Sequence, residues 1–199
     1  MGVLSPVLPS SIPPILSYFR GHQMAADYFP LKEKTRFEYK FTSTEFEGDA
    51  RICIDVLEVR KKAGKLVAQA RMIFELRDSH TTQYTITRDA KWLTTADGVI
   101  IGGRREFPFP VKEGLKWEEY PDTSEVVSLS DKVSIKAGKF AKCMKIVTML
   151  AGGDAGKSVR YYAPGVGYIL EEYSGEDKTC ELELLAISKV PEEKKKGKK

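Results

Sequence analysis

An alternation of apolar and polar residues with a period of two is the feature that most constrains the fold of this chain. Phe37, Tyr39 and Phe41 alternate with charged residues, and one apolar face continues from Leu66 to Leu76. Because successive side chains of a strand point to opposite faces, this period is typical of strands with one buried face. The pattern predicts strands over residues 36–41, 52–59, 66–76, 83–87, 91–95, 125–129, 132–136, 140–150, 159–163, 168–173 and 180–188.

Short turns rich in glycine separate these predicted strands, as at Glu47-Gly48-Asp49 and Ala137-Gly138-Lys139. Short gaps favour antiparallel hairpins, because parallel neighbours need a crossover of about a dozen residues or more. We therefore expect a mainly all-β fold, a curved antiparallel sheet or half-barrel of about ten or eleven strands. Between Val56 and Leu57 the apolar phase shifts by one residue, which predicts a β-bulge.

The two ends of the chain differ from this β region. Four prolines fall within residues 1–14, and residues 15–26 suit a short helix, since proline is favoured at the first helical position. A length of 199 residues fits a single domain. The predicted organisation is a Pro-rich N-terminal segment with a short helix (1–27), a single antiparallel β domain (28–190) and a disordered basic tail (191–199).

The positive charge of the chain is concentrated in that tail. Residues 191–199 hold five lysines and two glutamates, so they carry +3 of the formal net charge of +4. The nearly neutral remainder does not indicate a nucleic-acid-binding surface. No apolar run reaches the ~18 residues of a membrane helix, so no integral membrane segment is expected. The first basic residue, Arg20, follows the apolar N-terminal stretch, and no signal peptide is predicted.

Cysteine and histidine are too few for a structural zinc site, which needs four such ligands in close pairs. The chain has two histidines and three cysteines, and no Cys-x-x-Cys occurs. Cys53, Cys143 and Cys180 all lie in predicted strands, where we expect small buried apolar side chains. A Cys143–Cys180 disulfide is the alternative if their strands are neighbours. We predict no metal and no cofactor.

Two segments resemble catalytic or nucleotide-binding motifs, but their context argues against both. Residues 151–158, Ala-Gly-Gly-Asp-Ala-Gly-Lys-Ser, match a relaxed phosphate-loop pattern, yet a predicted strand follows where the motif requires a helix. Asp78-Ser79-His80 has the residue types of a hydrolase triad, but neighbours on a strand point to opposite faces. A pair formed by a cysteine and His80 across strands stays open. We expect no enzyme.

The supply of aromatic residues suggests a different kind of site. Most of these side chains are expected to fill the core, but a curved sheet also leaves an apolar concavity able to accept a ligand. The candidates for its lining are Phe37, Phe74, Trp117 and Tyr162. Arg104 and Arg105 are interpreted as solvated. Among the carboxylate pairs, which include Glu171-Glu172 and are not expected to be catalytic, Glu181 and Glu183 share a solvated face opposite Leu182 and Leu184.

An internal echo relates two parts of the chain. Residues 30–38 and 110–118 both read Pro, aliphatic, Lys, Glu, two variable residues, basic, aromatic, Glu. One interpretation is a strand-entry device used twice; the other is a sheet whose two halves open in the same way.

Several segments in one order resemble a family of bacterial envelope proteins, the TapB-like domain of unknown function. They are residues 28–32, 107–117, 137–143 and 161–167, the last reading Tyr-Tyr-Ala-Pro-Gly-Val-Gly and followed by Glu171. The resemblance implies an architecture similar to LolA/LolB-type lipoprotein carriers, a curved sheet with a helical cover. It also implies a cell-envelope or periplasmic location; without a leader, the chain would be cytoplasmic.

The leading hypothesis is a non-enzymatic β-sheet protein that binds a lipid-like or other hydrophobic ligand at a concave face. The alternative is a structural or assembly module that docks on envelope protein partners through exposed sheet edges. A Cys/His hydrolase is the third hypothesis. The oligomeric state, the ligand and the partner do not follow from the sequence.

Overall fold

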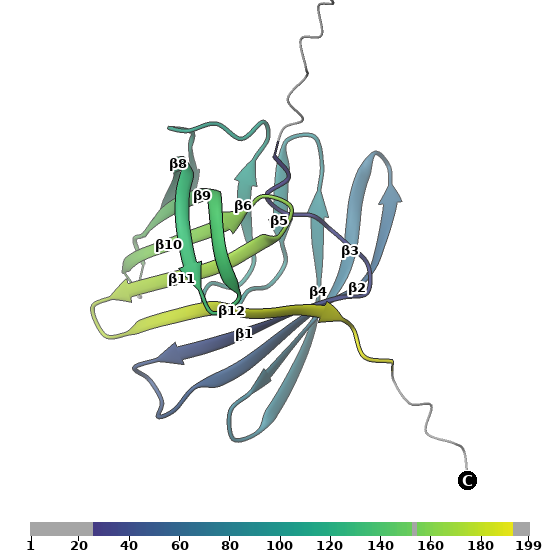
Figure 1. Cartoon of the computed structure of the whole chain (residues 1–199). Coiled ribbons are helices and arrows are strands. Elements are labelled where there is room, and N and C mark those ends of the chain that lie inside the picture. Colours follow the sequence, from purple (N-terminus) through teal and green to yellow (C-terminus); the bar gives the residue numbers. More distant parts are fainter. Residues whose placement is uncertain (1–25, 153–154, 193–199) are drawn as a thin grey trace, which may run out of the picture.

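One twelve-stranded antiparallel sheet makes up the folded part of the chain (Figure 1). The structure, a computed structural model, describes residues 26–152 and 155–192. The strands are β1 (Thr35–Ser43), β2 (Ala50–Lys62), β3 (Lys65–Glu75), β4 (Ser79–Arg88), β5 (Trp92–Thr95), β6 (Arg104–Pro108), β7 (Lys116–Glu119), β8 (Asp122–Ile135), β9 (Gly138–Leu150), β10 (Gly156–Ala163), β11 (Gly167–Gly175) and β12 (Thr179–Lys189).

The order of the strands describes a nearly closed ring. Except for β6 and β7, strands that are consecutive in sequence pair with each other, and β1 also pairs with β12, so the first and last strands lie at the centre of the sheet. The two free edges are β6 and β7, which are consecutive in sequence. The predicted all-β class and the antiparallel curved sheet are therefore confirmed, but the sheet curls further than a half-barrel.

The sheet consists of two six-stranded meanders, β1–β6 and β7–β12, and the first strand of each begins within one copy of the sequence echo. Lys34 and Gly114, at equivalent places in the two copies, both have a positive φ, 55° and 79° respectively. In both copies the strand then starts within two residues and carries the aromatic residue of the echo, Phe37 or Trp117. The echo thus marks the entry to each half of the sheet.

The structure has one strand more than the eleven predicted, because one strand was predicted as two and two strands were missed. The predicted runs 125–129 and 132–136 form one long strand, β8, whose pairing with β9 is interrupted by irregularities. The strands β6 and β7 were missed, because Arg-Arg-Glu-Phe-Pro and Lys-Trp-Glu-Glu are short and highly charged. The predicted bulge is confirmed by a register shift between Val56 and Glu58.

The gap between β6 and β7 is bridged by one arginine. The backbone N–H of Arg105 donates to both carboxylate oxygens of Glu119, at 3.1 and 3.0 Å, and its side chain donates to the Glu118 carbonyl. The Arg105 guanidinium also lies 4.6 Å from the ring of Trp92, which packs edge-to-face against Trp117. We call these contacts the β6–β7 seam.

The three cysteines are buried free thiols. The alternative Cys143–Cys180 disulfide is wrong, because β9 pairs with β8 and β10 whereas β12 pairs with β1 and β11. The glycine-rich segment around residue 152 connects two antiparallel strands, and Lys157 and Ser158 lie in β10 rather than at a helix start. The phosphate-loop interpretation is thus excluded by the fold.

A short segment before β1 crosses one end of the ring. The Arg88 guanidinium of β4 donates to the Asp27 carboxylate at 2.9 Å, and the Asp27 carbonyl accepts the Gly165 N–H at 2.8 Å. Tyr28 is buried and donates to the Lys142 carbonyl of β9, while Phe29 packs on Tyr162. This segment, purple in Figure 1, therefore spans between the two halves.

Several predictions fall at the ends of the chain. The predicted helix over residues 15–26 and most of the Pro-rich segment lie outside the described residues, and so do residues 193–199 of the predicted tail. The described ranges contain no helix, so they lack the helical cover that the resemblance implied. Nor does this part of the chain provide a helix that is long and apolar enough to span a membrane.

Candidate functional site

A cavity inside the ring is lined by both halves of the sheet. Its cavity volume is about 50 Å³, and the empty space reaches about 640 Å³ only when open solvent at the mouth is included. The apolar wall of the cavity belongs to β1, β2 and β4. The polar wall belongs to β5, β6 and β11 and adjoins the apolar one, since Thr95 of β5 pairs with Ile86 of β4. The apolar wall is formed by Phe37, Ile54, Val56 and Ile86. The polar wall includes Thr95, Arg104, Glu106 and Tyr168, and Tyr162 of β10 lies beside it.

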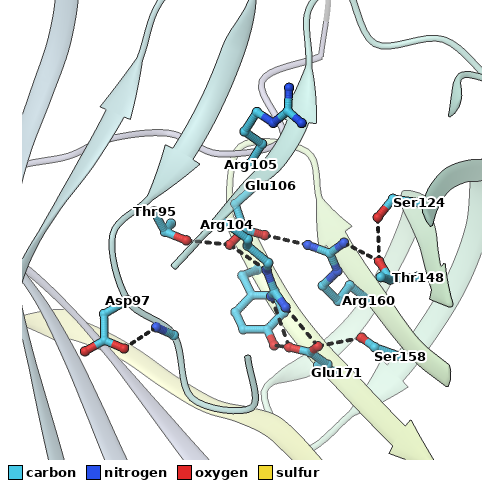
Figure 2. A network of polar contacts seen from close by, with 12 residues as sticks. Thr95, Asp97, Arg104, Arg105, Glu106, Ser124, Thr148, Ser158, Arg160 and Glu171 are labelled. Carbon is cyan, nitrogen blue, oxygen red and sulfur yellow. Dashed lines mark hydrogen bonds and ion pairs between the residues drawn. The ribbon is translucent and has the colours of Figure 1, made fainter. Parts of the chain in front are cut away.

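Glu106 is the centre of a buried polar network behind this wall (Figure 2). Its Oε1 accepts hydrogen bonds from the Thr95 hydroxyl at 2.9 Å and from Arg104 Nε at 3.0 Å. Its Oε2 accepts from Arg160 Nη1 at 2.8 Å and from the Tyr162 hydroxyl. Glu106 is the extra residue of a bulge, since Phe107 pairs with Leu93 and the preceding Arg105 pairs with Thr94. The bulge turns its carboxylate inward.

Glu171 on β11 forms the second half of the network. Its Oε1 accepts from the Ser158 hydroxyl at 2.5 Å and from Arg104 Nη1 at 3.3 Å. Its Oε2 accepts from Arg104 Nη2 at 3.2 Å and from the Tyr168 hydroxyl. Arg104 therefore joins both carboxylates and links the edge strand β6 to β11 across the interior.

Arg160 extends the network toward β8 and β9. Its Nη2 donates to the Thr148 hydroxyl at 2.7 Å, and Thr148 in turn shares a hydrogen bond with Ser124. Arg160 and Glu171 are each only 1% exposed, and Glu106 is 5% exposed. The Nε of Arg160 is buried without a hydrogen-bond partner among the described residues. A charged network this deep is tolerated because nearly every donor and acceptor is paired.

The electrostatics of the network keep both glutamates ionised. Burial alone would raise the pKa of Glu106, but the charges of Arg104 and Arg160 and the hydrogen bonds from Tyr162 and Thr95 lower it to about 2. Burial likewise opposes ionisation of Glu171, and the same two arginines hold its pKa below the ordinary value. Two positive and two negative charges therefore balance within this network.

Two of the four predicted lining residues lie at the cavity and two lie elsewhere. Phe37 and Tyr162 line the cavity. Phe74 instead packs edge-to-face against Phe41, which belongs to a cluster of buried apolar side chains. Trp117 packs against Trp92 at the β6–β7 seam. Phe74 and Trp117 are therefore core residues rather than neighbours of the cavity.

The charged residues of the network were misjudged from the sequence. Arg104 was interpreted as solvated, yet its side chain is only 11% exposed, and Glu171, which was not singled out among the many carboxylates, is 1% exposed. A signal was present: Glu171 falls on the same strand face as Ile169 and Tyr173, and Arg160 on that of Tyr162. A charge on the apolar phase of a strand indicates a buried ion pair.

His80 and the cysteines lie in different surroundings. His80 is exposed near the start of β4, whereas the cysteines are buried on β2, β9 and β12. The side chain of His80 makes no hydrogen bond or ion pair with the described residues. Within the same part of the chain, no group of three or more His, Cys, Asp or Glu side chains is arranged to hold a metal ion.

The fold and site define an all-β protein with a nearly closed antiparallel sheet around a partly polar interior. Comparison with solved structures finds this fold in a candidate exported protein with a YmcC-like fold from Bacteroides fragilis. The two align with a TM-score of 0.60 at 14% identity, over 82% of this chain and 100% of the other. A candidate lipoprotein from Parabacteroides distasonis aligns with a TM-score of 0.56 at 13% identity, over 83% and 100% of the respective chains.

Sequence comparison adds no family to this structural likeness. A scan against models of protein families finds no match. A search among curated proteins also finds none. The TapB-like resemblance and the LolA-type architecture therefore stay predictions, while the solved structure from Bacteroides fragilis has a YmcC-like fold.

Proposed function

We propose that this chain is a non-enzymatic binding protein of the bacterial cell envelope that holds a small lipid-like ligand inside its curved sheet. The observation that carries this proposal is the interior cavity, where an apolar wall adjoins a buried polar network. Ligand pockets with this character are mostly apolar and carry a few convergent polar groups that fix orientation. The export and lipoprotein descriptions of the two structural relatives support the envelope location.

The dimensions of the apolar wall suggest a ligand with a short chain. The wall reaches from β1 to β4, and at about 4.8 Å between neighbouring strands it extends over roughly 14 Å. An alkyl chain of about this length would bury its surface against Phe37, Ile54, Val56 and Ile86. Burial of apolar surface stabilises such a complex by about 25 cal/mol per Å².

Native mass spectrometry of the delipidated full chain with decanol tests this proposal. The variant Ile54→Trp fills the cavity, and its matched control is Ile187→Trp, because Ile187 is an exposed residue of β12. We expect the wild type and the control to bind alike and Ile54→Trp to bind at least about tenfold more weakly. Amide shifts in NMR spectra of the wild type should locate the bound chain at Phe37 and Ile86.

A wild type that takes up neither decanol nor a fatty acid nor a phospholipid would contradict the proposal. So would shifts confined to the outer face of the sheet. The NMR measurement needs no variant, so it decides the question even if Ile54→Trp does not fold.

A structural or assembly module remains the second candidate, supported by a different observation. β7 pairs with β8 only over residues 122–125, so in the described part of the chain no strand covers the outer edge of β8 over residues 127–135. Val127 and Met149 are exposed nearby. An uncovered strand edge can accept a strand from a partner. Capture of one envelope protein that is lost on a Val127→Pro change, with no ligand uptake, would favour this candidate.

A further inference from the structure

Two polar side chains that line the cavity form no hydrogen bond or ion pair with the buried network around Glu106 and Glu171. Four tyrosines line the cavity, and three of them donate hydrogen bonds: Tyr39 to the Tyr168 carbonyl, Tyr162 to Glu106 and Tyr168 to Glu171. The Tyr84 hydroxyl, by contrast, has no hydrogen-bond partner among the described residues. Burial and the nearby charges of Glu106 and Asp97 raise its pKa, so this hydroxyl stays protonated.

Asp97 is the second such group. It lines the cavity from the loop after β5, and its Oδ1 accepts the Gly98 N–H at 2.8 Å. No ion pair involves Asp97 within the described residues. Figure 2 shows its carboxylate to one side of the network formed by Arg104, Glu106 and Glu171.

The loop that carries Asp97 is tightly folded, which fixes the carboxylate at the cavity. A Cβ at Gly98 would lie 2.3 Å from the Ile101 carbonyl oxygen, and one at Gly103 would lie 2.8 Å from the Ala96 carbonyl oxygen. Only glycine tolerates such close approaches of backbone. Val99 in the same loop lines the cavity beside Asp97.

The charges around the cavity sum to an excess of one negative charge. Arg104 is paired with Glu106 at 3.0 Å and with Glu171 at 3.2 Å, and Arg160 is paired with Glu106 at 2.8 Å. These four groups balance one another, so Asp97 is uncompensated. A ligand carboxylate would meet this excess negative charge at low dielectric, whereas a cation would neutralise it.

We infer, resting on the proposed function, that the polar end of the ligand is a hydrogen-bond donor without negative charge, best a primary amine, that binds Asp97 and Tyr84. An ammonium group donates to the free carboxylate oxygen of Asp97 and to the Tyr84 oxygen, while its alkyl chain lies on the apolar wall. A hydroxyl group makes the same contacts without the ionic attraction. Alkyl amines and amino alcohols with a short chain are therefore the ligand class that this cavity favours over fatty acids.

Binding of decylamine, decanol and decanoate to the full chain tests this inference, because the three probes share one chain and differ only in the head. Isothermal titration at pH 7 should give affinities in the order amine, alcohol, carboxylate, with the amine at least about tenfold tighter than the carboxylate. Asp97→Asn keeps the Oδ1 acceptor for Gly98 and should remove most of the preference for the amine. It should leave decanol within about twofold. The matched control is Asp49→Asn, the same change of charge at an exposed turn.

The outcomes separate this inference from the proposed function. If none of the probes binds, the proposed function fails. If decanoate binds as tightly as decylamine, or if Asp97→Asn and Asp49→Asn affect decylamine equally, the inference is overturned while the cavity remains a ligand site. Tyr84→Phe gives an independent check, since it should weaken decanol and decylamine several-fold without changing the charge. The comparison of the three probes on the wild type decides the matter even if a variant does not fold.

Discussion

At the scale of single residues, the unusual feature is the dense pairing of the buried charges of Arg104, Glu106, Arg160 and Glu171. Glu106 and Glu171 each accept four hydrogen bonds, two at each carboxylate oxygen. Outside the ring, Asp55 is likewise buried between Arg36 and Arg71, which lie directly opposite it on the neighbouring strands. Burial opposes ionisation of Asp55, yet hydrogen bonds from both arginines lower its pKa.

These lowered pKa values predict a loss of stability in acid. A carboxyl whose pKa is lower in the folded state stabilises the fold above its unfolded pKa, and that contribution is lost as the pH falls through the folded pKa. For Glu106 the window runs from 4.5 down to about 2. This group alone should remove on the order of 3 kcal/mol of the free energy of unfolding across the window. Urea denaturation at a series of pH values measures the effect.

The variant Glu106→Gln provides the comparison for this prediction. At pH 7 it leaves Arg104 and Arg160 with one carboxylate, so we expect a loss of about 3 to 5 kcal/mol and a shallower pH dependence. The control Glu125→Gln breaks an exposed pair with Lys116 and should cost less than about 1 kcal/mol. An equal slope in the wild type and Glu106→Gln between pH 4.5 and 2 would contradict the assignment.

At the scale of elements, the shortest strands of the sheet are those near its open edges. β5 and β7 have four residues each and β6 has five, whereas β8 has fourteen. The β6–β7 seam replaces the backbone hydrogen bonds that a closed barrel would have there. Arg105 makes most of these contacts, to Glu118, Glu119 and Trp92. Edge strands of this kind are protected by charge and by short length.

We expect Arg105→Met to loosen the seam without unfolding the sheet. The change removes an ion pair, a hydrogen bond and a cation–π contact at a half-exposed position, which together contribute on the order of 1 kcal/mol. Hydrogen exchange of backbone amides in β6 and β7 should become faster, while β1 and β12 keep their protection. The control Arg60→Met removes an exposed arginine of β2 that pairs with Glu58. Unchanged exchange in β6 and β7 would show that the seam does not depend on Arg105.

At the scale of the whole molecule, the ring is closed by its two terminal strands. β1 pairs with β12 over residues 35–43, and the last backbone hydrogen bond of this junction runs from the Val190 N–H to the Lys34 carbonyl at 2.9 Å. Because the termini meet inside the sheet, the two free edges fall between the halves, at β6 and β7. The two most highly charged strands, β6 (Arg-Arg-Glu-Phe-Pro) and β7 (Lys-Trp-Glu-Glu), therefore lie at the opening.

Deletion of residues 191–199 should leave the melting temperature unchanged within error. The sheet ends at Lys189, and neither Pro191 nor Glu192 forms a hydrogen bond or ion pair with the described residues. Chain ends without such contacts contribute little to stability. Differential scanning calorimetry of the full and shortened chains measures the difference. A clear drop would show that this segment packs on the domain.

Much of the fold followed from local patterns. Period-two alternation identified ten of the twelve strands in whole or in part, and the phase shift after Val56 located a bulge. Glu181 and Glu183 were correctly placed on the polar face opposite Leu182 and Leu184, which are fully buried. These features depend on residues close together in the sequence. The charged strands β6 and β7 lack the alternation and were therefore missed.

By itself, the sequence determined the β class and the antiparallel hairpins, because these depend on side-chain period and on turns within a few residues; that the echo marks the entry to two halves was one of two open interpretations. Only the tertiary structure decided which charges are buried. Arg104, Glu106, Arg160 and Glu171 come from three strands and meet because the ring curls until β6 faces β10 and β11. The same curvature decides that Phe37 and Tyr162 face a cavity while Phe74 and Trp117 do not. A charge is stable in the interior only beside a partner, and the ion pairs Arg160–Glu106 and Arg104–Glu171 join residues that are 54 and 67 positions apart in the sequence.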